Sequence, residues 1–130
     1  MQQRKNHIFY LAMVTLAGWL IPGGGFFLIK ETRRAIIIFV TIAVIFIIGL
    51  YIGSTGVIDP VNAKLWFAIQ TLTTPLVLYI GFISSNYHEV YARPQEIGQI
   101  YTSIAGMLNL LCIINAIHKA YDKATADEVK

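Results

Sequence analysis

The chain has 130 residues, of which 56% are hydrophobic and 13% are charged, and its mean hydropathy is +0.63. This charged share is about half of the ~25% usual in a soluble domain, so the composition predicts a single integral membrane domain. The net charge of +3 does not indicate nucleic-acid binding, because the cations are spread over short polar segments that flank apolar runs. We therefore expect no nucleic-acid partner.

Four apolar runs follow one another along the chain, and none of them contains a charged residue. The first is short, and the other three are near the ~20 residues that cross a bilayer as a helix. Short connectors between them predict an all-α, four-helix antiparallel bundle with both termini on one side. The predicted transmembrane domain covers residues 1–118, with spans over 8–21, 35–53, 65–85 and 97–117 and a polar tail over 119–130.

The first run ends at a proline that three glycines follow. Proline lacks a backbone N–H and clashes with the preceding turn, so a helix stops or kinks there, whereas glycine permits unusual backbone angles. We predict a corner at the membrane surface, with Trp19 as an interfacial anchor and residues 26–29 in the headgroup zone. The turn residues are Pro22, Gly23, Gly24 and Gly25, and the cations expected to face lipid phosphates are Lys30, Arg33 and Arg34.

Two interpretations of this corner are open. The simpler one is a turn between two packed helices, with the cations extended to the membrane surface. The other is an anion site, in which free glycine N–H groups form a concave nest beside the three cations. A nucleotide-binding loop is not expected, because no G-K-[ST] follows the glycines.

The distribution of cations predicts the orientation in the membrane. In the predicted topology, the side opposite the termini carries the cluster from Lys30 to Arg34 together with Arg93. The terminal side carries more cations, namely Arg4, Lys5, Lys64, Lys119, Lys123 and Lys130. Because cytoplasmic loops are enriched in Lys and Arg, we expect both termini in the cytoplasm.

Small and polar residues form a stripe on the last predicted span. Gly98, Thr102 and Gly106 recur every four residues with Asn109 beside them, and Gly49 and Gly53 form a second pair in the second span. Such residues let helices approach closely and hydrogen-bond across the gap. We expect first that these residues pack against other helices of this chain. The alternatives are contact with another subunit and the lining of a pore or transport pathway. Asn115 is expected to face protein or water for the same reason.

The third predicted span is interrupted by Pro75, which follows a cluster of polar residues. Threonine hydroxyls can bond the carbonyls that a proline frees, so Gln70, Thr71, Thr73 and Thr74 are interpreted as repair of a kink. No Asp, Glu, Lys or Arg lies inside a predicted span, and no repeated half is visible in the sequence. Both observations argue against a secondary transporter.

No catalytic constellation is present, so a non-enzymatic protein is predicted. Ser84, Ser85 and His88 lack an orienting acid, and Cys112 lies inside an apolar run where a thiol is usually inert. We predict no metal site and no cofactor, because the histidines are isolated. Haem ligation by His7 and His118, which share one face of the predicted bundle, is kept as a third hypothesis.

Two stretches resemble an uncharacterised family of small bacterial polytopic membrane proteins. They are LAGWLIPGGGFFLIKETRRAIIIFVTIAVIFIIGL, with a P-G-x-G turn, and QEIGQIYTSIAGMLNLLCIINAIHKA, with an E-x-G start and an A-G-x-L-N-L-L core. The first is also distantly similar to two-transmembrane-segment domain proteins. Phe26, Phe27 and Leu28 depart from the histidine or tyrosine-leucine-glycine often found after the turn. The resemblance implies that the protein lies in the bacterial cytoplasmic membrane. It supports the predicted helical architecture but implies no biochemical activity.

The predicted function is that of a structural or accessory subunit which packs against other membrane protein subunits in a larger complex. The polar residues inside the spans are of the packing type, and two helices carry close-approach stripes. Anionic lipids are expected partners, and self-association is possible. The alternative is a homo-oligomeric channel, or a protein that binds or moves lipid through the segment from Gly23 to Arg34.

Overall fold

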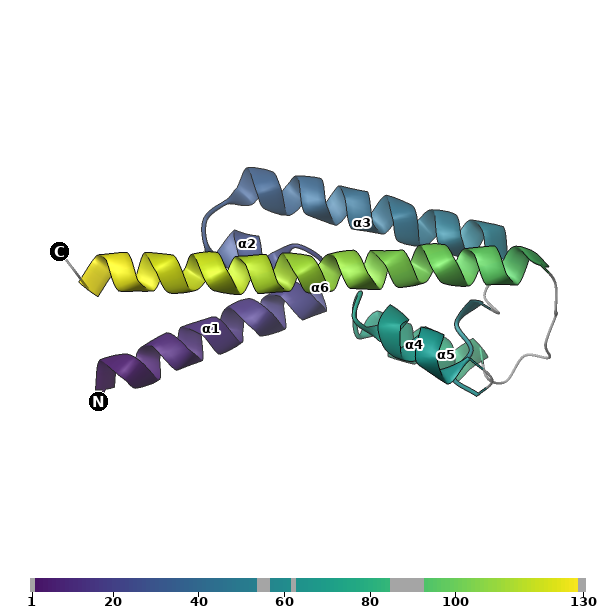
Figure 1. The fold of residues 1–130 in the computed structure, drawn as a ribbon, viewed down its shortest axis with the longest axis horizontal. Coiled ribbons are helices and arrows are strands. Elements are labelled where there is room, and N and C mark those ends of the chain that lie inside the picture. Colours follow the sequence, from purple (N-terminus) through teal and green to yellow (C-terminus); the bar gives the residue numbers. More distant parts are fainter. Residues whose placement is uncertain (1, 54–56, 62, 85–92, 129–130) are drawn as a thin grey trace.

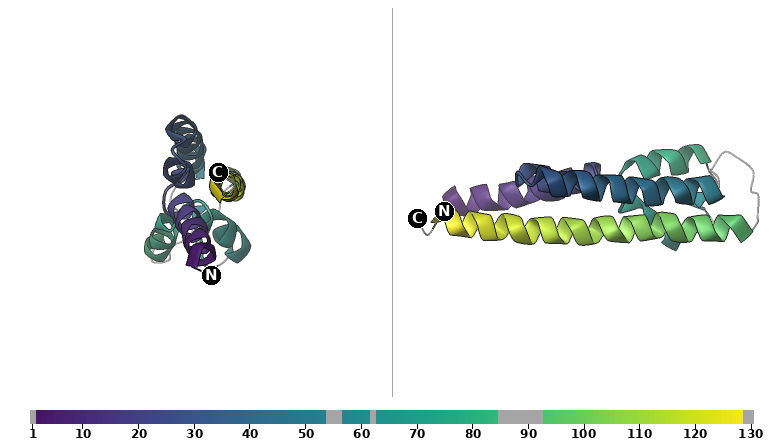
Figure 2. Two further views of the ribbon diagram at one scale, coloured as in Figure 1. Left: turned by 90° about the vertical axis from the view of Figure 1, so that its left-hand side faces the viewer. Right: turned by 90° about the horizontal axis from the view of Figure 1, so that it is seen from above.

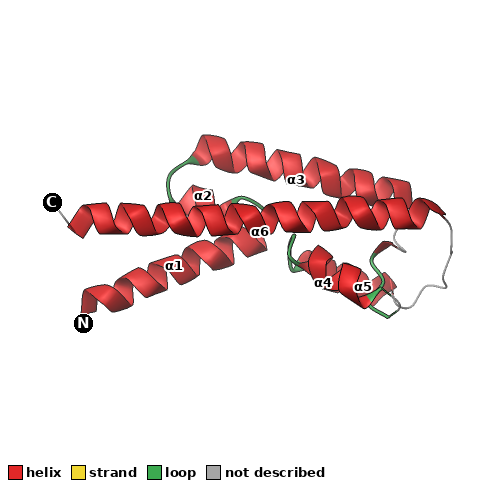
Figure 3. Ribbon diagram, viewed as in Figure 1, coloured by secondary structure: helices red, strands yellow, loops and turns green. Residues whose placement is uncertain are grey.

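The computed structural model describes residues 2–53, 57–61, 63–84 and 93–128, and these residues contain helices and no strand (Figure 3). The prediction of an all-α fold is therefore confirmed. The six described helices are α1 (Gln2–Leu20), α2 (Gly24–Leu28), α3 (Thr32–Gly53), α4 (Lys64–Thr71), α5 (Leu76–Ser84) and α6 (Arg93–Glu128).

Helix α6 is the axis of the molecule. Its 36 residues extend about 54 Å at 1.5 Å per residue. Helices α1 and α3 pack against it and run in the opposite direction, while α4 lies beside its N-terminal half (Figure 1). The N- and C-terminal ends of the chain lie at the same end of the molecule (Figures 1 and 2), which we call the terminal end.

Two helices are long and apolar enough to cross a membrane, namely α3 and the segment Glu96–Ala126 of α6. These contain the second and fourth predicted spans. The first predicted span lies in α1, whose apolar part, Asn6–Leu20, is shorter. The third is divided between α4 and α5. Helix α3 leaves most of its apolar side chains exposed, as expected of a helix that meets lipid.

The first hairpin consists of α1 and α2, and it folds back halfway along α6. Gly23 has φ = 78°, a left-handed conformation that favours glycine, and the three turn glycines are buried. A Cβ on Gly25 would lie 3.0 Å from both the Ala116 Cβ and the Val14 carbonyl oxygen. The glycines thus let α1, α2 and α6 approach closely, and the turn lies inside the bundle. The turn therefore lies beside the middle of α6 and not at one end of the bundle, while its depth in a membrane stays a prediction.

The core lies where the first hairpin, the start of α3 and the C-terminal half of α6 meet. Its largest member is Phe26, which is 1% exposed. The other buried members of this cluster are Val14, Ile29, Ala35, Ala116 and Ala120. Of the two aromatic residues expected in the headgroup zone, Phe26 is therefore part of the hydrophobic core, whereas Phe27 is exposed.

Helix α2 ends in a Schellman motif at Lys30. The Lys30 N–H donates to the Phe27 carbonyl (3.0 Å), the Glu31 N–H donates to the Phe26 carbonyl (2.9 Å), and Lys30 has φ = 66°. Because α2 runs back toward the terminal end, the following segment lies beside the last turns of α6, where Glu31 contacts Lys119. The sequence topology placed the Lys30–Arg34 cluster at the opposite end, and the return of α2 reverses that placement.

The second hairpin consists of α4 and α5. Pro75 lies in the turn between them, and Leu72 and Thr73 close the end of α4 with short-range bonds to the carbonyls of Ile69 and Gln70. Helix α5 then returns beside α4. The predicted kink is therefore a reversal of direction, and residues 65–85 do not form one span.

The two halves of the chain repeat one arrangement in opposite directions. In each half, a hairpin precedes a long helix, and the first helix of the hairpin runs parallel to that long helix (Figure 1). Helix α1 runs from the terminal end toward the middle, whereas α4 runs toward the middle from the other end. The sequence shows no matching repeat, so this relationship appears only in the structure.

Candidate functional site

The turns of the two hairpins meet against the middle of α6, at a place we call the junction. The Trp19 indole Nε1–H donates to the Thr71 carbonyl at 3.0 Å, and the Thr74 hydroxyl donates to the Leu20 carbonyl at 3.1 Å. Each bond joins one hairpin to the other. Trp19 was predicted to be an interfacial anchor, and it instead bonds the second hairpin.

Asn109 of α6 closes the junction. Its side chain is fully buried, and its amide nitrogen lies 3.1 Å from the Gly18 carbonyl oxygen, 2.9 Å from that of Leu72 and 3.0 Å from that of Thr73. These oxygens belong to the C-terminal ends of α1 and α4, where backbone carbonyls lack partners within the helix. The Asn109 side chain therefore contacts carbonyl groups of both hairpins that have no partner within their own helix.

A second buried contact lies nearer the start of α6. The Gln70 amide nitrogen donates to the Thr102 hydroxyl at 2.8 Å and to the Val57 carbonyl at 3.2 Å, and Thr102 donates to the Gly98 carbonyl at 2.9 Å. Gln70 and Thr102 are both fully buried. The polar residues before Pro75 thus bond to α6 and to the first hairpin, and they do more than repair the α4–α5 turn.

Four buried side-chain oxygens around these contacts have no hydrogen-bond partner in the described part of the chain: Gln70 Oε1, Thr73 Oγ1, Ser103 Oγ and Asn109 Oδ1. Thr73 Oγ1 faces α6, because it lies 3.2 Å from the place that a Cβ on Gly106 would take. A buried polar atom without a partner costs about 1–3 kcal/mol, and water or an ion usually satisfies it. The site offers uncharged oxygen ligands.

The predicted close-approach residues of α3 and α6 lie against one another. A Cβ on Gly49 would be 2.7 Å from Thr102 Cγ2, and a Cβ on Gly98 would be 2.7 Å from the Gly49 carbonyl oxygen and 2.8 Å from the Gly53 Cα. Gly106 meets the backbone of α4 at the Ile69 carbonyl. These glycines therefore bring helices of the same chain together.

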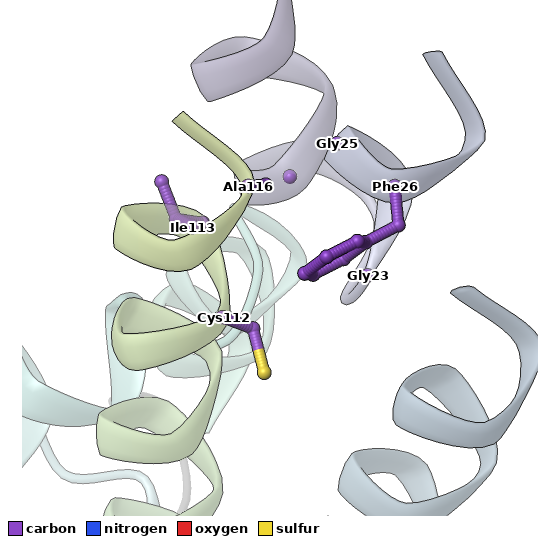
Figure 4. A pocket seen from close by; sticks show the side chains of 7 residues that line it. Gly23, Gly25, Phe26, Cys112, Ile113 and Ala116 are labelled. Atoms are coloured by element: carbon purple, nitrogen blue, oxygen red, sulfur yellow. The ribbon is translucent and has the colours of Figure 1, made fainter. Parts of the chain in front are cut away.

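The glycine turn is enclosed by apolar groups. Beside it lies a small hollow between α2 and α6, where Phe26 points toward α6 and Cys112 lies opposite (Figure 4). The hollow has no room for a water molecule. The Gly24 N–H donates to the Ile21 carbonyl at 2.7 Å. These observations give no support to an anion-binding nest at the turn.

The basic residues after α2 lie beside cations of α6 that the sequence analysis did not select. The Lys119 ammonium lies 3.0 Å from both carboxylate oxygens of Glu31, Arg34 lies 3.3 Å from one of them, and Lys123 donates to the Ile29 carbonyl at 2.7 Å. The hydrogen bond from Lys119 holds the pKa of Glu31 below its usual range. In the sequence, the spacing of Lys119 and Lys123, one helical turn apart, was the feature that could have indicated a basic face on this helix.

The remaining candidate residues give no assembled chemical site. Ser85 and His88 lie outside the described residues, and nothing is described of the Ser84 side chain. His118 lies 3.8 Å from Asp122 on the surface of α6. Within the described part of the chain, no three His, Cys, Asp or Glu side chains are grouped to hold a metal ion.

Residues 13–128 match a family of unknown function, DUF6677. The chain belongs to this family. The match covers most of the chain, from within α1 to the end of α6, and it agrees with the sequence prediction of an uncharacterised family. No curated protein and no solved structure matches the chain.

Proposed function

We propose that this DUF6677 protein is an integral membrane protein in which α3 and α6 cross the bilayer and the hairpins enter it from opposite sides. This arrangement replaces the predicted four spans by two spans and two re-entrant hairpins. Turns inside a bilayer are tolerated where they are buried in protein or line a polar cavity, and both turns here are covered by α6. The junction then lies near mid-membrane.

The positions of the cations support cytoplasmic termini more strongly in this arrangement. Within the described residues, the end opposite the termini carries only Lys64 and Arg93. The terminal end carries Arg4, Lys5, Lys30, Arg33, Arg34, Lys119 and Lys123. The positive-inside rule then favours the cytoplasm for the terminal end. The motif resemblance supports the bacterial cytoplasmic membrane as the location.

The function that the geometry supports best is a non-enzymatic channel for a small polar solute. The sequence left open a homo-oligomeric channel, whereas the polar site of the junction lies within one chain. The observation that carries this proposal is the group of buried, unpartnered oxygens at the place where two oppositely directed hairpins meet. In many membrane transport proteins, inverted halves meet at mid-membrane, and interrupted helices form the solute site there.

Water or a monovalent cation fits this site best. Carboxamide and hydroxyl oxygens accept hydrogen bonds or coordinate hard cations, and the C-terminal ends of α1 and α4 contribute partial negative charge. The partial negative charge of these helix ends would repel an anion. The bonds between Trp19 and Thr71 and between Thr74 and Leu20 close the junction, so opening would require them to separate.

Flux through proteoliposomes tests the channel. Purified full-length protein would be reconstituted, and water and potassium permeability would be measured by light scattering and by a cation-sensitive dye. Thr73→Val removes an unpartnered hydroxyl without removing a hydrogen bond between the hairpins. The matched control is Thr41→Val, on the exposed face of α3. We expect flux above that of empty vesicles, changed by Thr73→Val only. Wild-type flux equal to that of empty vesicles for both solutes would refute the channel.

The accessory-subunit role remains a second proposal, and Asn115 is the observation that favours it. This residue lies one turn before Lys119 on α6 and is exposed, and its side chain makes no hydrogen bond with the described residues. Leu111 and Ile114 are exposed beside it. On a membrane helix, an exposed amide beside apolar residues is stabilised when it forms a hydrogen bond with a group on another helix. The stripes of Gly49 and Gly98 no longer support this role, because they contact one another.

Native mass spectrometry of the chain, extracted gently from its own membranes by an affinity tag, tests this second role. A stoichiometric foreign subunit that is lost in Asn115→Leu and retained in Met107→Leu would support it. Met107 is a suitable control because it is an exposed apolar residue of the same helix. Oligomers of this chain alone would contradict the accessory role and would leave the channel proposal standing.

A further inference from the structure

A cavity of about 360 Å³ opens at the terminal end, between the first turns of α1, the end of α2 and the last turns of α6. Its polar lining comes from three separate parts of the chain: Asn6, His7 and Tyr10 of α1, Lys30 after α2, and Lys123 of α6. Leu28 and Ile29 add apolar surface. The volume lies at the lower end of the roughly 300–1,000 Å³ typical of small-ligand sites.

The carboxylate of Glu31 is shared among several cations, namely Lys119, Arg34 and, most weakly, Lys123 of this cavity. Glu31 is held by Lys119 at 3.0 Å and by Arg34 at 3.3 Å. The Lys123 ammonium donates to the Ile29 carbonyl, which fixes its position and leaves other N–H donors available. Lys30 and Lys123 are both lining residues of the cavity, and no Asp or Glu is among the lining residues described.

The backbone at Lys30 gives an independent reason to connect this side chain with a ligand. Lys30 occupies the left-handed position of the Schellman motif, at φ = 66°, where glycine is the usual residue. A side chain at such an angle strains the backbone, and strain of this kind is found most often at functional positions. A lysine that lines the cavity therefore occupies a backbone conformation that glycine would adopt with less strain.

We infer that this cavity binds the phosphate group of an anionic ligand, with Lys30 and Lys123 as its cationic partners. Ammonium groups bind phosphate by charge-assisted hydrogen bonds, and Asn6 and Tyr10 are polar residues of the same lining. The apolar side formed by Leu28 and Ile29 suits the glycerol and first acyl carbons of a phospholipid, while a soluble phosphate ester offers the same anionic group. The inference does not depend on the channel.

Binding would be measured with the full chain in detergent by native mass spectrometry, using phosphatidylglycerol, phosphatidylcholine and inorganic phosphate as separate probes. We expect retained phosphatidylglycerol, and weaker binding by about thirtyfold in the Lys30→Gln/Lys123→Gln double variant, which is about fivefold for each ammonium removed. Arg33→Gln is the matched control, since Arg33 is exposed on α3 and does not line the cavity. It should bind as the wild type does.

Lys30→Gly separates binding from folding. Glycine adopts the left-handed angle without strain, so this variant should be at least as stable as the wild type and should still lose about fivefold in affinity. Displacement of the lipid by inorganic phosphate, or phosphate binding with no lipid retained, would identify a soluble phosphate as the ligand. Equal losses in Arg33→Gln and in the double variant, or no binding of any probe, would overturn the inference.

Discussion

The side-chain amide of Asn109, in the middle of α6, lies 2.9 Å from the carbonyl oxygen of Leu72 in the turn between α4 and α5. The same nitrogen lies 3.1 Å from the Gly18 carbonyl oxygen in α1. The two hairpins enter from opposite ends of the molecule, so one residue of α6 holds together segments that are far apart in the sequence.

Replacement of Asn109 by leucine should destabilise the fold. The change leaves the carbonyls of Gly18, Leu72 and Thr73 without their donor. Because hydrogen bonds inside membranes are individually weak, we expect a loss of about 1–3 kcal/mol. Unfolding equilibria in bicelles would measure it.

Asn115→Leu is the matched control, since Asn115 is exposed and its side chain makes no hydrogen bond with the described residues. Its stability should equal that of the wild type in the isolated chain. An Asn109→Leu variant as stable as this control would show that the junction does not depend on the amide.

Glycine-to-alanine changes should differ according to what the new methyl group meets. A Cβ on Gly98 would lie 2.7 Å from the Gly49 carbonyl oxygen, which is backbone and cannot easily move, so we expect a loss of about 1–3 kcal/mol for Gly98→Ala. A Cβ on Gly18 would lie 2.9 Å from the flexible Ile113 side chain, and Gly18→Ala should cost less. Thermal unfolding of both variants in one detergent checks the order. The reverse order would contradict the described approach of α3 and α6.

Stability should depend on pH through Glu31. Its hydrogen bond with Lys119 lowers the pKa of Glu31 in the folded state. The ion pair therefore stabilises the fold at neutral pH, and its contribution is lost as the pH falls through that lowered pKa. The two side chains are 26% and 28% exposed, so the effect should be small and should weaken in salt.

The measurement for Glu31 is the thermal midpoint as a function of pH. Glu31→Gln should flatten the acidic part of this curve, whereas Asp122→Asn, at an exposed position of α6, should leave it nearly unchanged. A wild-type curve that matches Glu31→Gln throughout the acidic range would disprove a stabilising role for the pair.

The sequence predicted the helices better than their arrangement. The charge-free runs 35–53 and 97–117 lie within α3 and α6, because about 20 apolar residues without a breaker favour a long helix. Pro22 and Pro75 marked the correct interruptions. A proline shows where a helix ends along the chain, but not how far along its neighbour the end lies. The place of the first turn beside the middle of α6, and the reversal of direction at Pro75, were therefore not predicted.

The small residues in the sequence indicated close contact between helices, but only the structure shows which helices they contact. Gly49 and Gly98 each allow a close approach, and the spacing of small residues does not specify which helix comes near. Asn109 required a buried acceptor, and its acceptors are backbone carbonyls, which carry no sequence signal. Lys123 was missed because its acceptor, at Ile29, is likewise a carbonyl.

The measurement that tests the central claim most directly is the side of the membrane on which single cysteines react. On a Cys112→Ser background, Arg33→Cys and Val61→Cys would be labelled with a membrane-impermeant thiol reagent in oriented vesicles. Both positions are exposed. If the hairpins are re-entrant, Arg33→Cys reacts on the side of the termini and Val61→Cys on the opposite side. Four successive spans would give the reverse pattern, and that result would contradict the two-hairpin arrangement.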